Sequence, residues 1–374
     1  MTIKEKSLTI TAITGQTIPD ISTRSTIRHE AVEVLDPETW RQNPETAAQI
    51  IIKILGANYG THNVTSDTET LAQDIIDGGI VPFITPEHDA CAALIQLGQF
   101  DVELGRAACL PGTNGGKSAP IYTAFEAWRS GAVFPQSQVL RAEVRTAKPT
   151  KEVPGGLATQ AIFLRKCRLN FCPTAIGPFF HHGCPDRQEM FILASTCKNP
   201  TEIISMAKTI IVPNIIFTSP TEENMLNEMW RMAFETNIRL ESVDKRVDCG
   251  FSIQDDGPFI TLLPTKKTDF DWKRALLKGF DMGQRFALAR LPLNKTTSPV
   301  INGGIEDLRN FGFKLVGFEP TFNQNGISIS LLMGKLSKEG QQKLISSCFP
   351  EGVFTHHLED LLLQNTINWR ENEK

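Results

Sequence analysis

A cluster of cysteine and histidine side chains between residues 167 and 184 has the donor atoms that a zinc ion prefers. Thiolate sulfur and imidazole nitrogen together form tetrahedral zinc sites. The spacing Cys-x4-Cys is at the wide edge of the usual range, and no second Cys-x2-Cys pair accompanies it. Cys167 also lies in an apolar segment, where a buried thiol is common. Zinc is therefore an alternative interpretation, with the ligands Cys167, Cys172, His181 and Cys184.

Two adjacent histidines in the same segment indicate a second kind of chemistry. Imidazole titrates near neutral pH, so His181 and His182 beside Asp186 have the groups for acid–base catalysis. Neighbouring histidines in a loop are more often solvated, and no nucleophile paired with a base is evident in the sequence. An enzyme of the cytosol with its site near His181, His182, Cys184 and Asp186 is thus the rival hypothesis, and the sequence leans against it.

Residues 112–118 contain glycines, a lysine and a serine, which are the residue types of nucleotide-binding loops. That pattern requires a glycine five residues before Gly116, and Pro111 occupies this position. Residues 106–110 are not expected to form the preceding strand, and Pro120 falls where the following helix should already be established. We therefore expect a loop that joins two helices.

Basic side chains in the middle of the chain have the charge that binds nucleic-acid phosphates. Seven lysines and arginines lie between residues 141 and 168, and three more lie within about 40° of one another on a predicted helix whose opposite side is apolar. Each group alone is also typical of a solvated helix. The candidate phosphate contacts are Arg141, Arg145, Lys148, Lys151, Arg165, Lys166, Arg168, Arg274, Lys278 and Arg285.

The formal charge changes along the chain. Residues 1–140 hold 9 basic and 16 acidic side chains, residues 141–290 hold 21 and 17, and residues 291–374 hold 8 and 9. The three segments therefore carry net charges of -7, +4 and -1, within a total of -4. One interpretation of this asymmetry is a positive groove between two lobes, and the other is an ordinary uneven distribution of charged residues. Net charge bears on association with partners and not on the fold.

Apolar spacing, together with proline and glycine positions, predicts a mainly helical first half after a terminal strand at residues 7–13. The second half also contains β-structure, because alternating apolar residues on both sides of two turns predict two hairpins. The turns are Asp255-Asp256-Gly257 and residues 323–326. The expected helices are 46–55, 66–76, 86–104, 118–128, 139–147, 157–169, 222–240, 270–290, 338–347 and 354–369.

These elements predict a fold that is mainly α with a minor antiparallel β component, an α+β class with two lobes. The first lobe is helical and the second combines helices with the two hairpins. The expected parts are a β-forming arm at 1–28, a helical lobe at 29–218, an α+β lobe at 219–350, and a closing helix and tail at 351–374.

Bulk composition excludes several classes of protein. With 27 glycines and 22 prolines in 374 residues, the chain is neither collagen-like nor of low complexity. No apolar stretch approaches the roughly 20 residues that cross a bilayer, so no membrane partner is expected. The start of the sequence has no secretory pattern, so the eight cysteines are expected to be reduced in the cytoplasm.

The leading hypothesis is a self-assembling structural protein that coats nucleic acid. A basic groove between lobes would bind RNA phosphates without regard to sequence, while the N-terminal arm and the C-terminal helix would join copies into a homo-oligomer. Nucleoproteins of RNA viruses are built on that logic, although no motif here matches theirs. A capsid or shell protein without such a groove is the closest alternative, and a regulatory binding module is compatible with the same features.

Overall fold

The computed structural model describes residues 7–8, 34–59, 67–111, 113, 119–146, 171–178, 188–198, 212–213, 220–234, 240–241, 249–255, 260–266, 269–293, 298–323, 326–345, 347, 360, 363–364 and 369.

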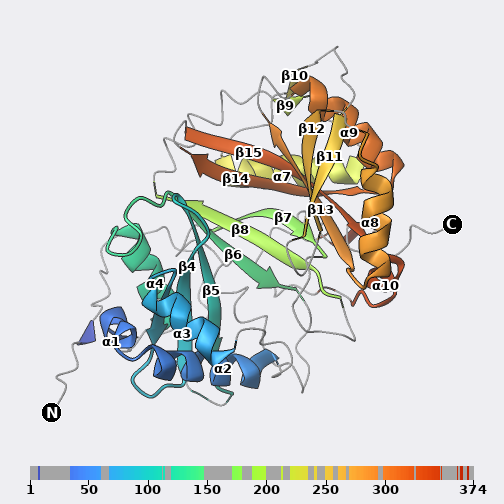
Figure 1. Cartoon of the computed structure of the whole chain (residues 1–374). Coiled ribbons are helices and arrows are strands. Elements are labelled where there is room, and N and C mark those ends of the chain that lie inside the picture. Colours follow the sequence, from blue (N-terminus) through green and yellow to red (C-terminus); the bar gives the residue numbers. More distant parts are fainter. Residues whose placement is uncertain are drawn as a thin grey trace. The chain divides into compact units, whose positions relative to one another are not determined.

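The dominant feature of the described chain is a mixed β-sheet. Eleven strands belong to it in the order β11-β12-β13-β15-β14-β7-β8-β6-β5-β4-β3 (Figure 1). The prediction of a mainly α fold with a minor antiparallel component and a helical first lobe is therefore wrong. The chain forms two compact units: unit 1 comprises Met1–Gln96, Glu103–Pro135 and Lys151–Pro154, and unit 2 comprises Leu97–Val102, Gln136–Thr150 and Gly155–Lys374.

Three strands occupy segments that were predicted to be helical. Strands β4 (Ala90–Gln96) and β5 (Asp101–Cys109) replace the helix expected at 86–104, and β6 (Val139–Arg145) replaces the one at 139–147. The first five residues of β4 are all buried, so the alternation of apolar and polar residues that marks a half-buried strand is absent. A short buried strand cannot be told from a buried helix by periodicity.

The glycine-rich segment before helix α4 (Ala119–Arg129) joins a strand to a helix, not two helices as expected. Strand β5 runs to Cys109, which contradicts the view that no strand precedes the loop. Pro120 is the second residue of α4, a position that tolerates proline because its N–H would have no partner in the helix. Residues 112 and 114–118 lie outside the described part of the chain.

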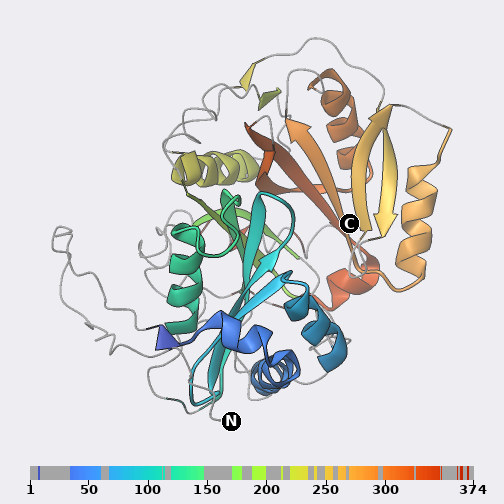
Figure 2. The same ribbon diagram turned by 60° about the vertical axis from the view of Figure 1, so that its left-hand side comes forward.

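Unit 1 has helices on both faces of its strands (Figure 2). Ile80 and Ile84 of strand β3 (Ile80–Ile84) point into an apolar core with Cys91 and Ala93 of β4. This core is covered by α1 (Pro37–Arg41), α2 (Pro44–Tyr59) and α3 (Thr68–Ile76). Helix α4 packs against β3 and β4 on the other face, where Phe83 is fully buried. The helices predicted at 46–55, 66–76 and 118–128 are thus confirmed.

Unit 2 contains both predicted hairpins as antiparallel strand pairs, β11 with β12 and β14 with β15. The helix expected at 270–290 is wrong in its second half, because α8 ends at Asp281 and β13 begins at Phe286. Gly283, with φ 99°, makes the turn between them. The regular elements of unit 2 besides β6 are β7 (Cys172–Gly177), β8 (Phe191–Cys197), β9 (Val212–Pro213), α7 (Pro220–Phe234), β10 (Leu240–Glu241), β11 (Cys249–Asp255), β12 (Ile260–Lys266), α8 (Trp272–Asp281), β13 (Phe286–Leu293), α9 (Ser298–Asn310), β14 (Lys314–Asn323), β15 (Gly326–Leu336) and α10 (Lys338–Gln342).

Both terminal segments are described only in part. In the N-terminal arm, β1 (Ser7–Leu8) pairs antiparallel with β2 (Val34–Leu35) of the same chain. In the C-terminal segment, the buried Trp369 ring meets Phe286 edge-on at a centroid distance of 6.3 Å. The helix predicted at 157–169 and most of the one at 354–369 lie outside the described residues. None of the helices that the structure describes has both the length and the apolar character to cross a membrane.

Candidate functional site

Arg141, the first of the predicted phosphate contacts, lies within unit 2 between two carboxylates. Its guanidinium is 3.2 Å from Asp101, forms an ion pair with Glu319, and donates a hydrogen bond of 3.0 Å to the carbonyl of Pro320. Burial raises the pKa of Asp101, and the charge of Arg141 opposes that change. The Arg141 side chain is 17% exposed, so its charge is balanced inside the fold.

Arg145 and Arg285 are also engaged by carboxylates. Arg145 forms a two-pronged pair with Glu189, with Nε–Oε2 and Nη2–Oε1 distances of 2.6 and 2.7 Å, and the Glu189 side chain is fully buried. Arg285 is buried and lies 3.1 Å from Glu339. These side chains bind strands and turns of unit 2 to one another.

Helix α8 presents the exposed part of the predicted basic set. Asp271 caps it by accepting a hydrogen bond of 3.1 Å from the Arg274 N–H, and Trp272 and Leu276 form its buried side. Arg274 and Lys278 lie on the opposite, exposed side, and neither pairs with an acid among the described residues. The remaining predicted contacts fall outside the described chain: Lys148, Lys151, Arg165, Lys166 and Arg168.

Of the four proposed zinc ligands, the described part of the chain includes Cys172. Cys172 lies on β7, where its thiol donates to the carbonyl of Met232 at 3.2 Å. Cys197 lies on the adjacent strand β8, and burial raises its pKa to about 12. No group of three metal-binding side chains occurs among the described residues. The other members of the zinc and acid–base alternatives lie beyond the described part of the chain: Cys167, His181, His182, Cys184 and Asp186.

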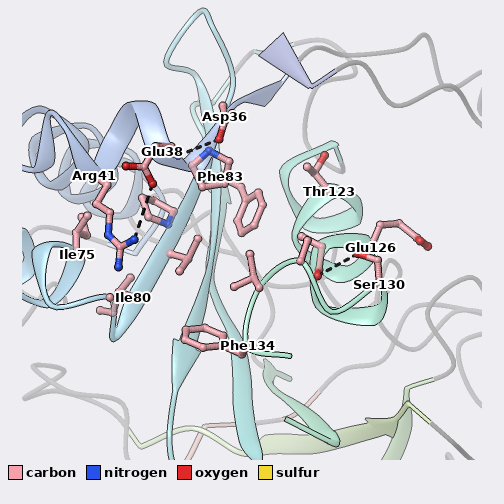
Figure 3. A pocket seen from close by; sticks show the side chains of 17 residues that line it. Asp36, Glu38, Arg41, Ile75, Ile80, Phe83, Thr123, Glu126, Ser130 and Phe134 are labelled. Atoms are coloured by element: carbon pink, nitrogen blue, oxygen red, sulfur yellow. Dashed lines mark hydrogen bonds and ion pairs between the residues drawn. The ribbon is translucent and has the colours of Figure 1, made fainter. Parts of the chain in front are cut away.

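A cavity of about 560 Å³ lies in unit 1 along strand β3, the last strand in the sheet order (Figure 3). Helix α1 and the end of α3 line one side of it, and α4 with the loop that follows lines the other. Its apolar lining includes Ile75, Ile80, Val81, Pro82 and Phe83. Because side chains alternate along a strand, Ile80 and Pro82 face the helices α1–α3 while Val81 and Phe83 face α4. The cavity therefore reaches both faces of β3 around the edge that pairs with no other described strand.

The backbone of β3 is only half satisfied by the sheet. The N–H of Gln96 donates to Gly79 at 2.8 Å and the N–H of Thr85 donates to Ala90 at 3.1 Å, which fixes the alternation of the antiparallel ladder. By that alternation Val81 and Phe83 bond to β4, whereas Ile80, Pro82 and Ile84 turn their backbone groups to the cavity side. Pro82 has no N–H, so its outward position breaks no ladder bond.

The charged residues at the rim are largely balanced. Asp36 caps α1 by accepting the Glu38 N–H at 3.0 Å, and the Glu38 carboxylate lies 3.8 Å from Arg41. On the α4 side, Glu126 pairs with Arg129 at 2.6 Å. The Arg41 guanidinium rests against Gly78, where a Cβ would come within 2.7 Å of its Nη2. The rim is therefore polar but carries little uncompensated charge.

Phe134 forms part of the cavity wall in a strained backbone conformation. Its φ is 47°, and the left-handed region costs a residue with a side chain about 1–2 kcal/mol. The loop before it is set by Gly131, with φ 77°, and by a hydrogen bond of 3.1 Å from the Val133 N–H to Ala127. The loop thus holds an aromatic side chain against the cavity at a cost in conformational energy.

None of the cavity residues was identified from the sequence. The segment from Ile80 to Ile84 contains Pro82, and proline within a short apolar run indicates an edge strand beside which a hollow can form. The partners across the cavity come from residues 36 to 41 and 123 to 134, and no local spacing relates these two segments.

No family model matches the chain, and no curated protein matches it. Among solved structures, aminoglycoside 6'-acetyltransferase type Ii aligns with a TM-score of 0.31 and 9% identity, over 42% of this chain and 93% of that chain. A putative acetyltransferase of the GNAT family from Desulfovibrio desulfuricans aligns with a TM-score of 0.29 and 13% identity, over 40% of this chain and 92% of that chain. An acetyltransferase of the GNAT family from Bacillus anthracis aligns with a TM-score of 0.28 and 11% identity, over 44% of this chain and 95% of that chain.

Proposed function

We propose that unit 1 binds a small, largely apolar molecule in the cavity at the edge of β3. The observation that carries the proposal is the cavity itself, whose volume of about 560 Å³ lies within the range of small-molecule sites. Its apolar lining supplies the free energy of burial, and the rim groups of Glu38 and Arg41 supply polar contacts for orientation.

A small molecule fits this site better than a peptide that would extend the sheet. Strand addition requires alternating donors and acceptors along the free edge. Pro82 removes the central donor on the outward side of β3, a device by which proteins protect their edges.

Indole is a suitable probe, because it is apolar, neutral and small enough for the cavity. Titration of methyl-labelled protein, followed by NMR, should give saturable shifts at Ile75, Ile80 and Val81. The substitution Ala127→Phe fills the cavity from α4, so the dissociation constant should rise by about tenfold or more.

The matched control is Ile76→Phe, which adds the same ring to unit 1 at a half-exposed position outside the lining. It should leave indole binding unchanged. Shifts that do not saturate, or equal binding to both variants, would remove the basis for a site at β3.

A second proposal concerns nucleic acid and rests on the exposed cations of α8. We propose that Arg274 and Lys278 contact RNA phosphates as part of a self-assembling coat in the cytoplasm. Their exposure on one side of α8 supports it, as does the apolar opposite side that holds the helix in place. The cysteines at 91, 109, 172, 197 and 249 are free thiols, which suits a reducing compartment.

The experiment compares RNA binding of the wild type with that of Arg274→Glu/Lys278→Glu across salt concentrations. Each lost phosphate contact should reduce the slope of log affinity against log salt by about 1. The control is Arg231→Glu, which changes a similarly exposed arginine on α7 that is paired with Glu228. Equal affinity of both variants would contradict the proposal, and particles that form without RNA would favour a shell protein.

A further inference from the structure

A buried guanidinium in unit 2 has no hydrogen-bond partner among the residues that the structure describes. Arg309, in the last turn of α9, has a side chain that is 9% exposed. Its nearest carboxylate is Glu222, in the first turn of α7, at 3.6 Å from Nη2, which is too long for a hydrogen bond. The nitrogens Nε, Nη1 and Nη2 are all buried and all unbonded. Within the described part of the chain, these three nitrogens are thus available to a further group.

This arrangement is costly unless something else occupies it. A buried charge requires hydrogen bonds to replace those lost from water, and almost all buried polar groups have them. Burial lowers the pKa of Arg309, while Glu222 opposes the change. Arginine keeps its proton at any ordinary pH, so it cannot escape the cost by becoming neutral.

Two lysines lie in the same region: Lys314 is close enough to Glu222 and to Lys335 for both charges to act on it. Lys314, at the start of β14, places its ammonium 5.5 Å from the ring centroid of Trp369. Lys335, on β15, donates a hydrogen bond of 2.7 Å to the carbonyl of Phe311, and its ammonium lies 5.1 Å from the centroid of the Phe311 ring. Burial lowers the pKa of Lys314 to about 8, with Glu222 opposing the change and Lys335 adding to it.

The Glu222 carboxylate is already shared between two groups. Glu222 accepts a hydrogen bond of 3.3 Å from the Leu315 N–H in addition to its contact with Arg309. Burial raises the pKa of the Cys249 thiol of β11 to about 11, and the charge of Asp307, on the same helix as Arg309, adds to that change. Glu222 therefore lies beside Arg309 of α9 and close enough to Lys314 of β14 to act on its charge, while Lys335 of β15 acts on Lys314 from the next strand. These named groups comprise three cations and one carboxylate.

We propose that Arg309, Lys314 and Lys335 form a binding site for a small oxyanion, such as phosphate or a carboxylate. The planar guanidinium of Arg309 would donate two hydrogen bonds to two oxygens of the anion, and the lysine ammonium groups would supply charge from the side of the sheet. Lys314 and Lys335 are half-buried, so part of each residue is in contact with solvent. The site belongs to unit 2 and does not depend on the proposed cavity ligand.

The first experiment measures binding of inorganic phosphate to the full chain by calorimetry, with chloride added to hold the ionic strength constant. We expect saturable binding that Arg309→Met weakens by about tenfold or more, because hydrogen bonds to charged groups are the strong ones. Lys314→Met should weaken it as well. The control Arg231→Met removes an exposed arginine of α7 that is paired with Glu228, and it should bind phosphate like the wild type.

A second variant keeps the test decisive if Arg309→Met fails to fold. Glu222→Gln removes the negative charge that competes with the anion, so phosphate should bind more tightly. Weaker or unchanged binding to Glu222→Gln would overturn the proposal, as would equal binding to the wild type and Lys314→Met. Acetate, titrated in a parallel arm, distinguishes a carboxylate site from a phosphate site.

Discussion

The buried pair of Arg145 and Glu189 gives the sharpest prediction about the stability of unit 2. Both side chains are nearly or fully shielded, and two hydrogen bonds of 2.6 and 2.7 Å join them. Removing one partner leaves the other charge buried and uncompensated, which typically costs about 3–5 kcal/mol. Since domains are stable by only about 5–15 kcal/mol, Arg145→Met should consume a large part of that margin.

Two further variants separate the charge pair from the packing. The double variant Arg145→Met/Glu189→Leu removes both charges, so it should recover most of the loss and come within about 1–2 kcal/mol of the wild type. Arg129→Met breaks a pair of the same 2.6 Å length whose side chains are 60% and 43% exposed. There the cost should stay below about 1 kcal/mol, because water screens exposed charges.

The assay is urea unfolding followed by circular dichroism, with RNA affinity measured on the same samples. The expected result is a large loss of unfolding free energy for Arg145→Met, without a loss of RNA affinity under conditions where the variant is folded. A loss below about 1 kcal/mol together with weaker RNA binding would refute the reasoning. It would instead support the phosphate contact that the sequence predicted for Arg145.

Three other perturbations follow from single positions. Gly317→Ala should destabilise by more than about 2 kcal/mol in thermal unfolding, because φ is 146° and the new Cβ would clash with the carbonyl of Thr174 on β7. The stability of the wild type relative to Lys314→Met should rise as pH increases from about 8 to 10.5, since in that range the unfolded wild-type chain binds the Lys314 proton and the folded chain does not. Pro82→Ala restores a donor on the open edge of β3, so sedimentation should show concentration-dependent association absent from the wild type.

The elements that the sequence identified are those in which local chemistry agrees with burial. Helix α3 has Asp67 as a cap, with a hydrogen bond of 2.7 Å from the Thr70 N–H, and one buried face. The prediction of a helix at 139–147, where the structure has strand β6, failed for a different reason. Arg141 and Arg145 are four residues apart, and a spacing of four places side chains on the same face in a strand as well as in a helix. The period alone could not decide between the two structures.

The roles of the charged residues were beyond local reasoning because their partners are distant in the sequence. Arg145 meets Glu189, which is 44 residues away, and Arg141 meets Glu319, which is 178 residues away. A basic segment therefore looks the same in the sequence whether its charges face solvent or form ion pairs with distant residues inside the fold. The exposed cations of α8 were recognisable, because that helix is short and carries its own apolar side.

Arg145 and Arg309 show what the surroundings of a buried arginine reveal about its role. Both lie in unit 2 with side chains less than 10% exposed, yet Arg145 forms two short hydrogen bonds to Glu189 whereas Arg309 forms none with any described residue. A structural role accounts for Arg145, since its donors are used within the fold. For Arg309 the same explanation leaves its donors unused, so the two methionine variants should differ in kind. Arg145→Met should lose stability and keep phosphate binding, whereas Arg309→Met should lose phosphate binding and, without phosphate, cost less stability than Arg145→Met.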